Sequence, residues 1–240
     1  MDPRLSSASR ATPLPVATDE QHNLSVFLTK VYGWMAAGLL LTAATALLVA
    51  DSPAALELIF GNRLVFWGLI IAEFGLVVFI SARIQTLQVG TAVFLFMLYA
   101  VLNGVTMAAI FRMYTGSSIA ATFAVTAGTF AAMSVYGYVT KTDLSRFGNL
   151  LLMAVVGLII AGLVNMFLQN SLLQTVISGV GVLVFTALTA YDTQKIKEQA
   201  LEMGHEGESG AKVALLGALT LYLDFINLFL FMLRFFGDRR

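Results

Sequence analysis

Residues 147–191 read FGNLLLMAVVGLIIAGLVNMFLQNSLLQTVISGVGVLVFTALTAY. Two long apolar runs, 147–169 and 172–191, flank the short polar stretch Gln169-Asn170-Ser171. The hydrocarbon core of a bilayer, about 30 Å thick, is crossed by roughly 20 apolar residues in a helix. Both runs lack the period-two alternation of membrane barrel strands, and each is about twice as long as such a strand. This stretch therefore predicts two transmembrane helices joined by a tight turn as an antiparallel hairpin.

Similar apolar runs fill most of the remaining chain. The sequence is 58% hydrophobic and only 12% charged, whereas a soluble domain carries about 25% charged residues. We therefore predict an all-α integral membrane fold, a bundle of seven transmembrane helices within a single domain, 27–240. The other five predicted spans are 31–50, 64–82, 88–111, 117–139 and 213–236.

The N-terminal segment, residues 1–26, differs from the rest. It holds three of the four prolines together with several Ser and Thr residues. This composition favours a disordered polar tail. No apolar run follows its early arginines closely enough to form a signal peptide.

The positive-inside rule gives the expected orientation, with the N-terminus in the cytosol. The segments on that side carry nine basic residues and those on the other side carry five. The nine are Arg4, Arg10, Lys30, Arg83, Lys141, Arg146, Lys195, Lys197 and Lys212. The five are Arg63, Arg112, Arg234, Arg239 and Arg240, of which the last three violate the rule. The short soluble parts and the absence of a targeting peptide suit a bacterial inner membrane, although the sequence also allows an endoplasmic reticulum membrane.

Composition also limits the chemistry. A net charge of zero gives no electrostatic basis for a nucleic-acid partner. The chain has no cysteine, and its two histidines, His22 and His205, fall outside the predicted spans. Thiol chemistry and a histidine-based site within the membrane are therefore excluded. We expect a protein that is not an enzyme, carries no cofactor, and has membrane lipid around it.

The informative residues are the few polar ones at membrane depth, because an ionisable side chain at a helix centre costs at least about 2.5 kcal/mol there. Asp224 lies well inside the last span, and Asn227 is three residues further on the same helix face. Asp192 lies near the predicted cytosolic end of the sixth span. Glu73 lies midway through the second span, whose cytosolic end carries Arg83. Arg83 could reach inward and meet Asp192 at a similar depth on the same side of the membrane. The amides Asn103 and Asn165 complete this polar set.

The segments around the two aspartates resemble one family. Residues 185–196, FTALTAYDTQKI, look like the sixth-helix motif of the Bax inhibitor family, also called transmembrane Bax inhibitor motif proteins. Residues 219–227, LTLYLDFIN, continuing to Leu233-Arg234-Phe235-Phe236, look like its seventh helix. Together with the span layout, the resemblance covers about 25–240.

This resemblance implies a fold in which helix seven is central. It implies a calcium leak across the membrane, gated by pH through an aspartate pair, here Asp192 and Asp224. The arginine that locks the closed state in the family matches Arg83 best, although the loop after Arg83 differs from the family pattern. Some bacterial relatives are associated instead with a membrane-bound AAA protease, as modulator or substrate.

The chemistry of two carboxyls supports the same mechanism. Held close in a low dielectric, Asp192 and Asp224 cannot both ionise easily, so they share a proton and titrate as a pair. The protonated pair would join two helices, and the ionised pair would repel and attract a hard cation such as calcium. Asn227 and backbone carbonyls are the expected additional ligands.

Two other functions stay open. An intramembrane aspartyl protease also places aspartates on consecutive helices, with Tyr-Asp on the first, as Tyr191-Asp192 does. Its second aspartate follows Gly-x-Gly, whereas Asp224 follows Leu221-Tyr222-Leu223 and has no glycine to open the helix. The third possibility is a regulator of a membrane-bound protease or another membrane partner, without transport of its own.

Overall fold

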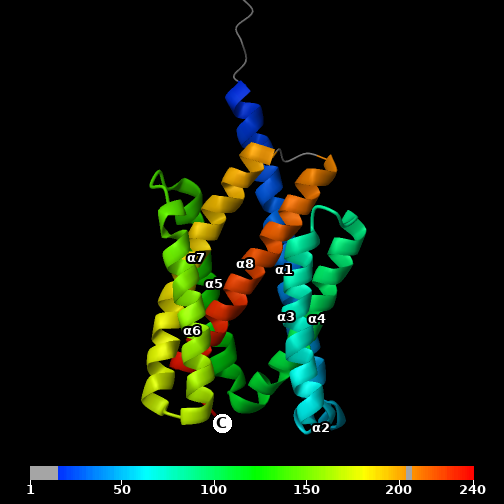
Figure 1. The fold of residues 1–240 in the computed structure, drawn as a ribbon, viewed down its shortest axis with the longest axis vertical. Helices are drawn as coiled ribbons and strands as arrows, with labels where there is room; N and C mark the ends of the chain where they lie inside the picture. The colour runs from blue at the N-terminus through cyan, green and yellow to red at the C-terminus, as the bar shows by residue number, and fades with distance from the viewer. Residues whose placement is uncertain (1–15, 204–206) are drawn as a thin grey trace, which may run out of the picture.

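The computed structural model describes residues 16–203 and 207–240, and within them it is all-helical with seven helices long and apolar enough to cross a membrane (Figure 1). The predicted fold class is therefore confirmed. The elements are α1 Val16–Ala50, α2 Pro53–Phe60, α3 Arg63–Arg83, α4 Val89–Met113, α5 Gly116–Val139, η1 Ser145–Phe147, α6 Gly148–Leu168, α7 Ser171–Met203 and α8 Gly207–Phe236.

Two boundaries differ from the sequence-based expectation. Helix α1 begins at Val16, inside the range predicted as tail, and its first turns project beyond the other helices (Figure 1). The expected disorder of residues 1–15 concerns a segment outside the described residues. Helix α7 runs to Met203, far beyond the predicted end of the sixth span at residue 191. Hydropathy marks where a helix leaves the apolar layer, whereas the helix itself continues as long as its backbone hydrogen bonds do.

Helix α8 is the centre of the bundle. In its most apolar 18-residue window 72% of the residues are buried, compared with 6–33% in the other six spans. It packs against α1, α4, α5 and α7. Helix α3 instead packs mainly on α4 and α2, and α6 mainly on α7. Both lie at the edge of the bundle, and α8 crosses obliquely behind and between them (Figure 1).

Glycines allow two of the helix pairs to approach closely. A side chain at Gly137 of α5 would collide with the carbonyl group of Ala190 of α7. At Gly104 of α4, a Cβ would lie 2.6 Å from the carbonyl oxygen of Thr42 of α1. Such close backbone approach is typical of small residues between membrane helices.

Polar side chains terminate one helix and cap the next at the connection between α6 and α7. At the predicted tight turn, Gln169 adopts a left-handed conformation with φ of 50°. The Asn165 Oδ1 atom accepts a hydrogen bond from the Asn170 backbone N–H at 3.0 Å. The Asn170 Oδ1 atom in turn accepts from the backbone N–H of Leu173 at 3.0 Å. The antiparallel arrangement of α6 and α7 follows from this turn.

Candidate functional site

Asp192 of α7 and Asp224 of α8 lie side by side inside the bundle. Their exposed fractions are 8% and 5%, and their carboxyl groups are neighbours close enough to interact with each other. The Asp224 Oδ2 atom is buried without a hydrogen-bond partner. Two ionised carboxylates can only accept hydrogen bonds, so a hydrogen bond between them requires one proton. The pair is therefore short of donors.

Positive charge near this aspartate pair comes from one residue of its own helix. Lys195, one turn after Asp192, lies close enough to interact electrostatically with that carboxyl. Its side chain is exposed, and its ammonium lies 5.7 Å from the ring centroid of Tyr191. Solvent screens such an exposed charge, so Lys195 neutralises the pair only weakly.

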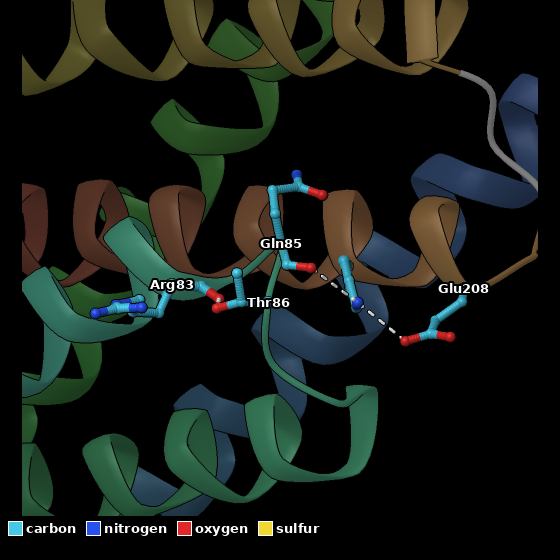
Figure 2. Close-up of polar contacts among 5 residues, drawn as sticks. Arg83, Gln85, Thr86 and Glu208 are labelled. Carbon is cyan, nitrogen blue, oxygen red and sulfur yellow. Dashed lines mark hydrogen bonds and ion pairs between the residues drawn. The ribbon is translucent and has the colours of Figure 1, made fainter.

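Arg83 is not brought to the aspartates. It is exposed at the end of α3 and makes no salt bridge among the described residues. Figure 2 shows its side chain directed away from Gln85 and Glu208. The cation that links α8 to this loop is Lys212, whose Nζ atom lies 2.9 Å from Glu208 Oε1 and donates to the Gln85 carbonyl oxygen at 3.1 Å. Depth along the membrane suggested a meeting of Arg83 with Asp192, but α3 packs on a different side of the bundle.

A second polar cluster lies across α8 from the aspartate pair. The Glu73 carboxyl of α3 is 9% exposed and lies near the Asn103 and Thr106 side chains of α4. Its Oε1 atom is buried without a hydrogen-bond partner. The Tyr222 hydroxyl of α8 donates to Asn103 Oδ1 at 3.2 Å and lies 2.6 Å from Thr42 Oγ1 of α1. Helices α1, α4 and α8 thus meet at the Tyr222 and Thr42 hydroxyls and the Asn103 amide, which we call the tyrosine network; the Glu73 carboxyl lies beside it.

The tyrosine network contains donors as well as acceptors. Tyr222 and Thr42 each carry one hydroxyl hydrogen, and the backbone carbonyls of Gly38 and Ala100 both lie 2.9 Å from Thr42 Oγ1. The ring of Tyr222 is fully buried and packs edge-on against those of Phe96 and Tyr99, each at 5.7 Å between centroids. Both hydroxyls of the tyrosine network are therefore hydrogen-bonded, and they join three helices.

The two remaining amides do not join the aspartate pair. The Asn227 Nδ2 atom donates to the Leu223 carbonyl of its own helix at 2.9 Å. Asn165 Nδ2 donates to Gln174 Oε1 at 3.0 Å, beside the α6–α7 turn. The geometry gives Asn165 a structural contact at the turn, and Asn227 one within α8.

A cavity of about 700 Å³ opens on the side of the bundle that holds the C-terminus. Glu73 and Asn103 lie at its deep end, and Arg234 and Arg239 also line it. Its wall includes residues of both α3 and α6. Neither Asp192 nor Asp224 lines the cavity. In the described conformation the aspartate pair and the cavity are therefore separate.

The oxygen atoms present limit what a metal ion would find. Across residues 16–203 and 207–240 no three His, Cys, Asp or Glu side chains are grouped to hold a metal ion. Calcium takes six to eight oxygen ligands. Asp192 and Asp224 would supply only part of such a set, with the rest from water or backbone carbonyls. Two carboxyls alone are too few ligands for a tightly bound calcium ion.

Sequence reasoning missed one contact close to the aspartates. Gln194 is buried two residues after Asp192, where its Oε1 atom accepts from the Leu144 backbone N–H at 2.8 Å and its Nε2 atom donates to the Thr142 carbonyl at 2.9 Å. It fastens the α5–α6 connection to α7. In that connection the Ser145 backbone N–H donates to Asp143 Oδ1 at 2.9 Å and lowers the pKa of this exposed carboxyl.

Comparison with known proteins gives the lineage. Residues 24–240 match the family model described as inhibitor of apoptosis-promoting Bax1. The chain belongs to the Bax inhibitor family. The match includes both helices of the aspartate pair and confirms the predicted resemblance.

Relatives in this family are similar over almost their whole length. The chain is 53% identical over 218 residues to inner membrane protein YbhL of Escherichia coli strain K12, covering 90% of this chain and 93% of YbhL. An uncharacterized protein of Borreliella burgdorferi is 47% identical over 214 residues, 89% of this chain and 92% of that protein. One from Deinococcus radiodurans is 43% identical over 227 residues, 93% of this chain and 96% of that protein. These names state no transported ion or partner.

Proposed function

We propose that this Bax inhibitor family protein is a pH-sensitive calcium leak, gated by Asp192 and Asp224. The observation that carries the proposal is the contact between two buried carboxyls on α7 and α8 with an unpartnered oxygen on Asp224. A membrane protein keeps such groups in its interior at a cost in stability, which is typical of ion and proton pathways.

The gate depends on the shared proton. At low pH one proton between the carboxyls forms a hydrogen bond that holds α7 against α8. At higher pH the pair loses this proton, and two negative charges repel while attracting a divalent cation. Movement of α7 away from α8 would then connect the pair with the cavity that contains Glu73. Leak should therefore increase as pH rises.

Orientation and location belong to the same proposal. Basic residues favour an N-terminus in the cytosol. The cavity would then open on the opposite side, and calcium would pass Glu73 before it reaches the aspartate pair. The name of the Escherichia coli relative supports an inner membrane as the location.

The test is calcium flux into proteoliposomes between pH 5 and 8. We expect a leak that rises with pH in the wild type and loses most of its pH dependence in Asp192→Asn and in Asp224→Asn. Asp143→Asn is the matched control, because Asp143 is an exposed carboxyl outside the pair. Its profile should equal that of the wild type.

Two outcomes would overturn the proposal. A wild-type flux no greater than that of empty liposomes at every pH would remove the leak itself and favour regulation of a membrane partner. A leak with the same pH profile in both aspartate variants would remove the gate.

A further inference from the structure

Two guanidinium groups lie together where the cavity meets the C-terminal side of the bundle. Arg234 belongs to the last turn of α8, and Arg239 to the short segment after it. Both line the cavity, and they are close enough to repel each other electrostatically. Among the described residues the only salt bridge joins Lys212 to Glu208, so neither arginine has an acidic partner there.

The acid next to them in sequence faces elsewhere. Asp238 lines a separate hollow beside α5, together with Ser118 and Phe236. Its backbone N–H donates to Ser118 Oγ at 3.0 Å and its carbonyl accepts from the Thr115 N–H at 3.2 Å. An isolated antiparallel backbone bridge joins Arg239 to Tyr114, and the Arg239 guanidinium lies 5.9 Å from the centroid of the Tyr114 ring. The segment is therefore fixed with Asp238 outside the cavity and Arg239 lining it.

The outer part of the cavity has apolar walls beside the polar residues Gln169, Asn170 and Ser171 of the α6–α7 turn. Phe66 and Ile70 of α3, Met166 of α6 and Leu230 of α8 line the cavity. Its deep polar end lies some distance away, because Asn103 and Met113 of α4 both line it and ten helical residues span about 15 Å. A ligand for this outer part needs an anionic group for the arginines and an apolar part for the walls.

We propose that Arg234 and Arg239 bind the phosphate of an anionic phospholipid, whose acyl chains leave the cavity between α3 and α6 over Phe66, Ile70 and Met166. Guanidinium groups bind phosphate by paired, charge-assisted hydrogen bonds. Basic pockets between transmembrane helices are a recurrent form of lipid headgroup site. The bound phosphate would also remove the repulsion between the two arginines. This inference does not rest on the proposed calcium transport, although the site opens into the same cavity.

The experiment measures thermal unfolding of the full-length protein in detergent, with added phosphatidylglycerol, phosphatidylcholine or inorganic phosphate. Phosphatidylglycerol should raise the unfolding midpoint of the wild type more than either alternative does. The shift should shrink in Arg234→Gln and in Arg239→Gln and vanish in the double variant. Arg112→Gln is the charge-matched control, because Arg112 is exposed at the end of α4 and does not line the cavity. It should respond as the wild type does.

A second pair of variants protects the test against general damage to the fold. Arg234→Lys and Arg239→Lys keep the charge and should retain part of the shift. Equal responses of wild type and double Gln variant would overturn the proposal. So would equal effects of phosphatidylglycerol and phosphatidylcholine, which would mean that the lipid is bound without regard to charge. An equal effect of inorganic phosphate would replace the lipid by a free anion.

Discussion

The aspartate pair and the tyrosine network are both buried polar clusters on α8, but they differ in whether their polar atoms have hydrogen-bond partners. In the pair, two carboxyls face each other and Asp224 Oδ2 has no partner. In the network, the hydroxyls of Tyr222 and Thr42 lie within bonding distance of acceptors on three helices. A buried acceptor without a donor costs stability, whereas a completed bond adds a little. The comparison suggests that the pair is kept for function and the network for the fold.

The largest change in stability is expected for Asp224→Asn. The amide supplies donors to Asp192 and removes a charge, so we expect stability at pH 8 to increase by about 1–3 kcal/mol. The gain should shrink at pH 5, because there the wild-type pair holds its shared proton and is already hydrogen-bonded. Reversible unfolding in detergent at both pH values measures the difference. A loss of stability at pH 8 would contradict the assignment of the pair as a costly feature.

Removal of the network's central hydroxyl should act in the opposite direction. Tyr222→Phe keeps the ring packing and loses hydrogen bonds between helices, which are worth about 0.6 kcal/mol on average and at most about 1.7 in membrane proteins. We expect a decrease in stability within that range that is the same at pH 5 and pH 8. The same unfolding assay measures it, and an increase in stability would argue against a satisfied network.

A double-mutant cycle sharpens the assignment of the bond between Tyr222 and Thr42. If the 2.6 Å contact between the hydroxyls is a hydrogen bond, Thr42→Val and Tyr222→Phe should not be additive. The expected coupling energy is about 0.6 kcal/mol. Additive effects in unfolding would show that the two hydroxyls act independently.

The smallest effect is expected at Thr45, one turn from Thr42 on α1. Its hydroxyl donates only to the Leu41 carbonyl of its own helix, at 2.8 Å. Thr45→Val should therefore change stability by less than about 0.5 kcal/mol. A larger loss would mean that the deletion of any hydroxyl destabilises α1. The effect of Thr42→Val could then not be assigned to the contact with Tyr222.

The fold was largely predictable because the bilayer sets the length of each span. The burial of Asp224 was also accessible from the sequence, since a carboxyl at this depth must face the protein interior. Its pairing with Asp192, which lies near the end of its span, was implied by the family resemblance. The network could not be predicted in the same way. Thr42 and Tyr222 are common residues in apolar helices, and their partnership depends on which helices adjoin. The sequence feature that comes closest to indicating this contact is the position of Tyr222, two residues before Asp224.

Arg83 shows the limit of arguments from depth. Sequence placed it on the same membrane side as Asp192, but depth contains no information about position around the bundle. Helix α3 packs on α4, and the guanidinium is exposed. The predicted locking role of Arg83 stays a prediction, and Arg83→Gln with the flux assay tests it. The short helix α2 was missed because hydropathy cannot distinguish Pro53–Phe60 from a loop, although Ser52 caps it by accepting from Ala55 N–H at 3.3 Å.

The last residues of the chain have a practical consequence for anyone who attaches a reporter to it. The Arg240 backbone N–H donates to the Met113 carbonyl at 3.0 Å, and Asp238 accepts from Thr115. A fluorescent protein or affinity tag fused directly after Arg240 would strain these hydrogen bonds and displace the neighbouring Arg239. A fusion intended to report topology would therefore disturb the region whose location it measures. Attachment before α1, or after a long flexible linker, avoids that conflict.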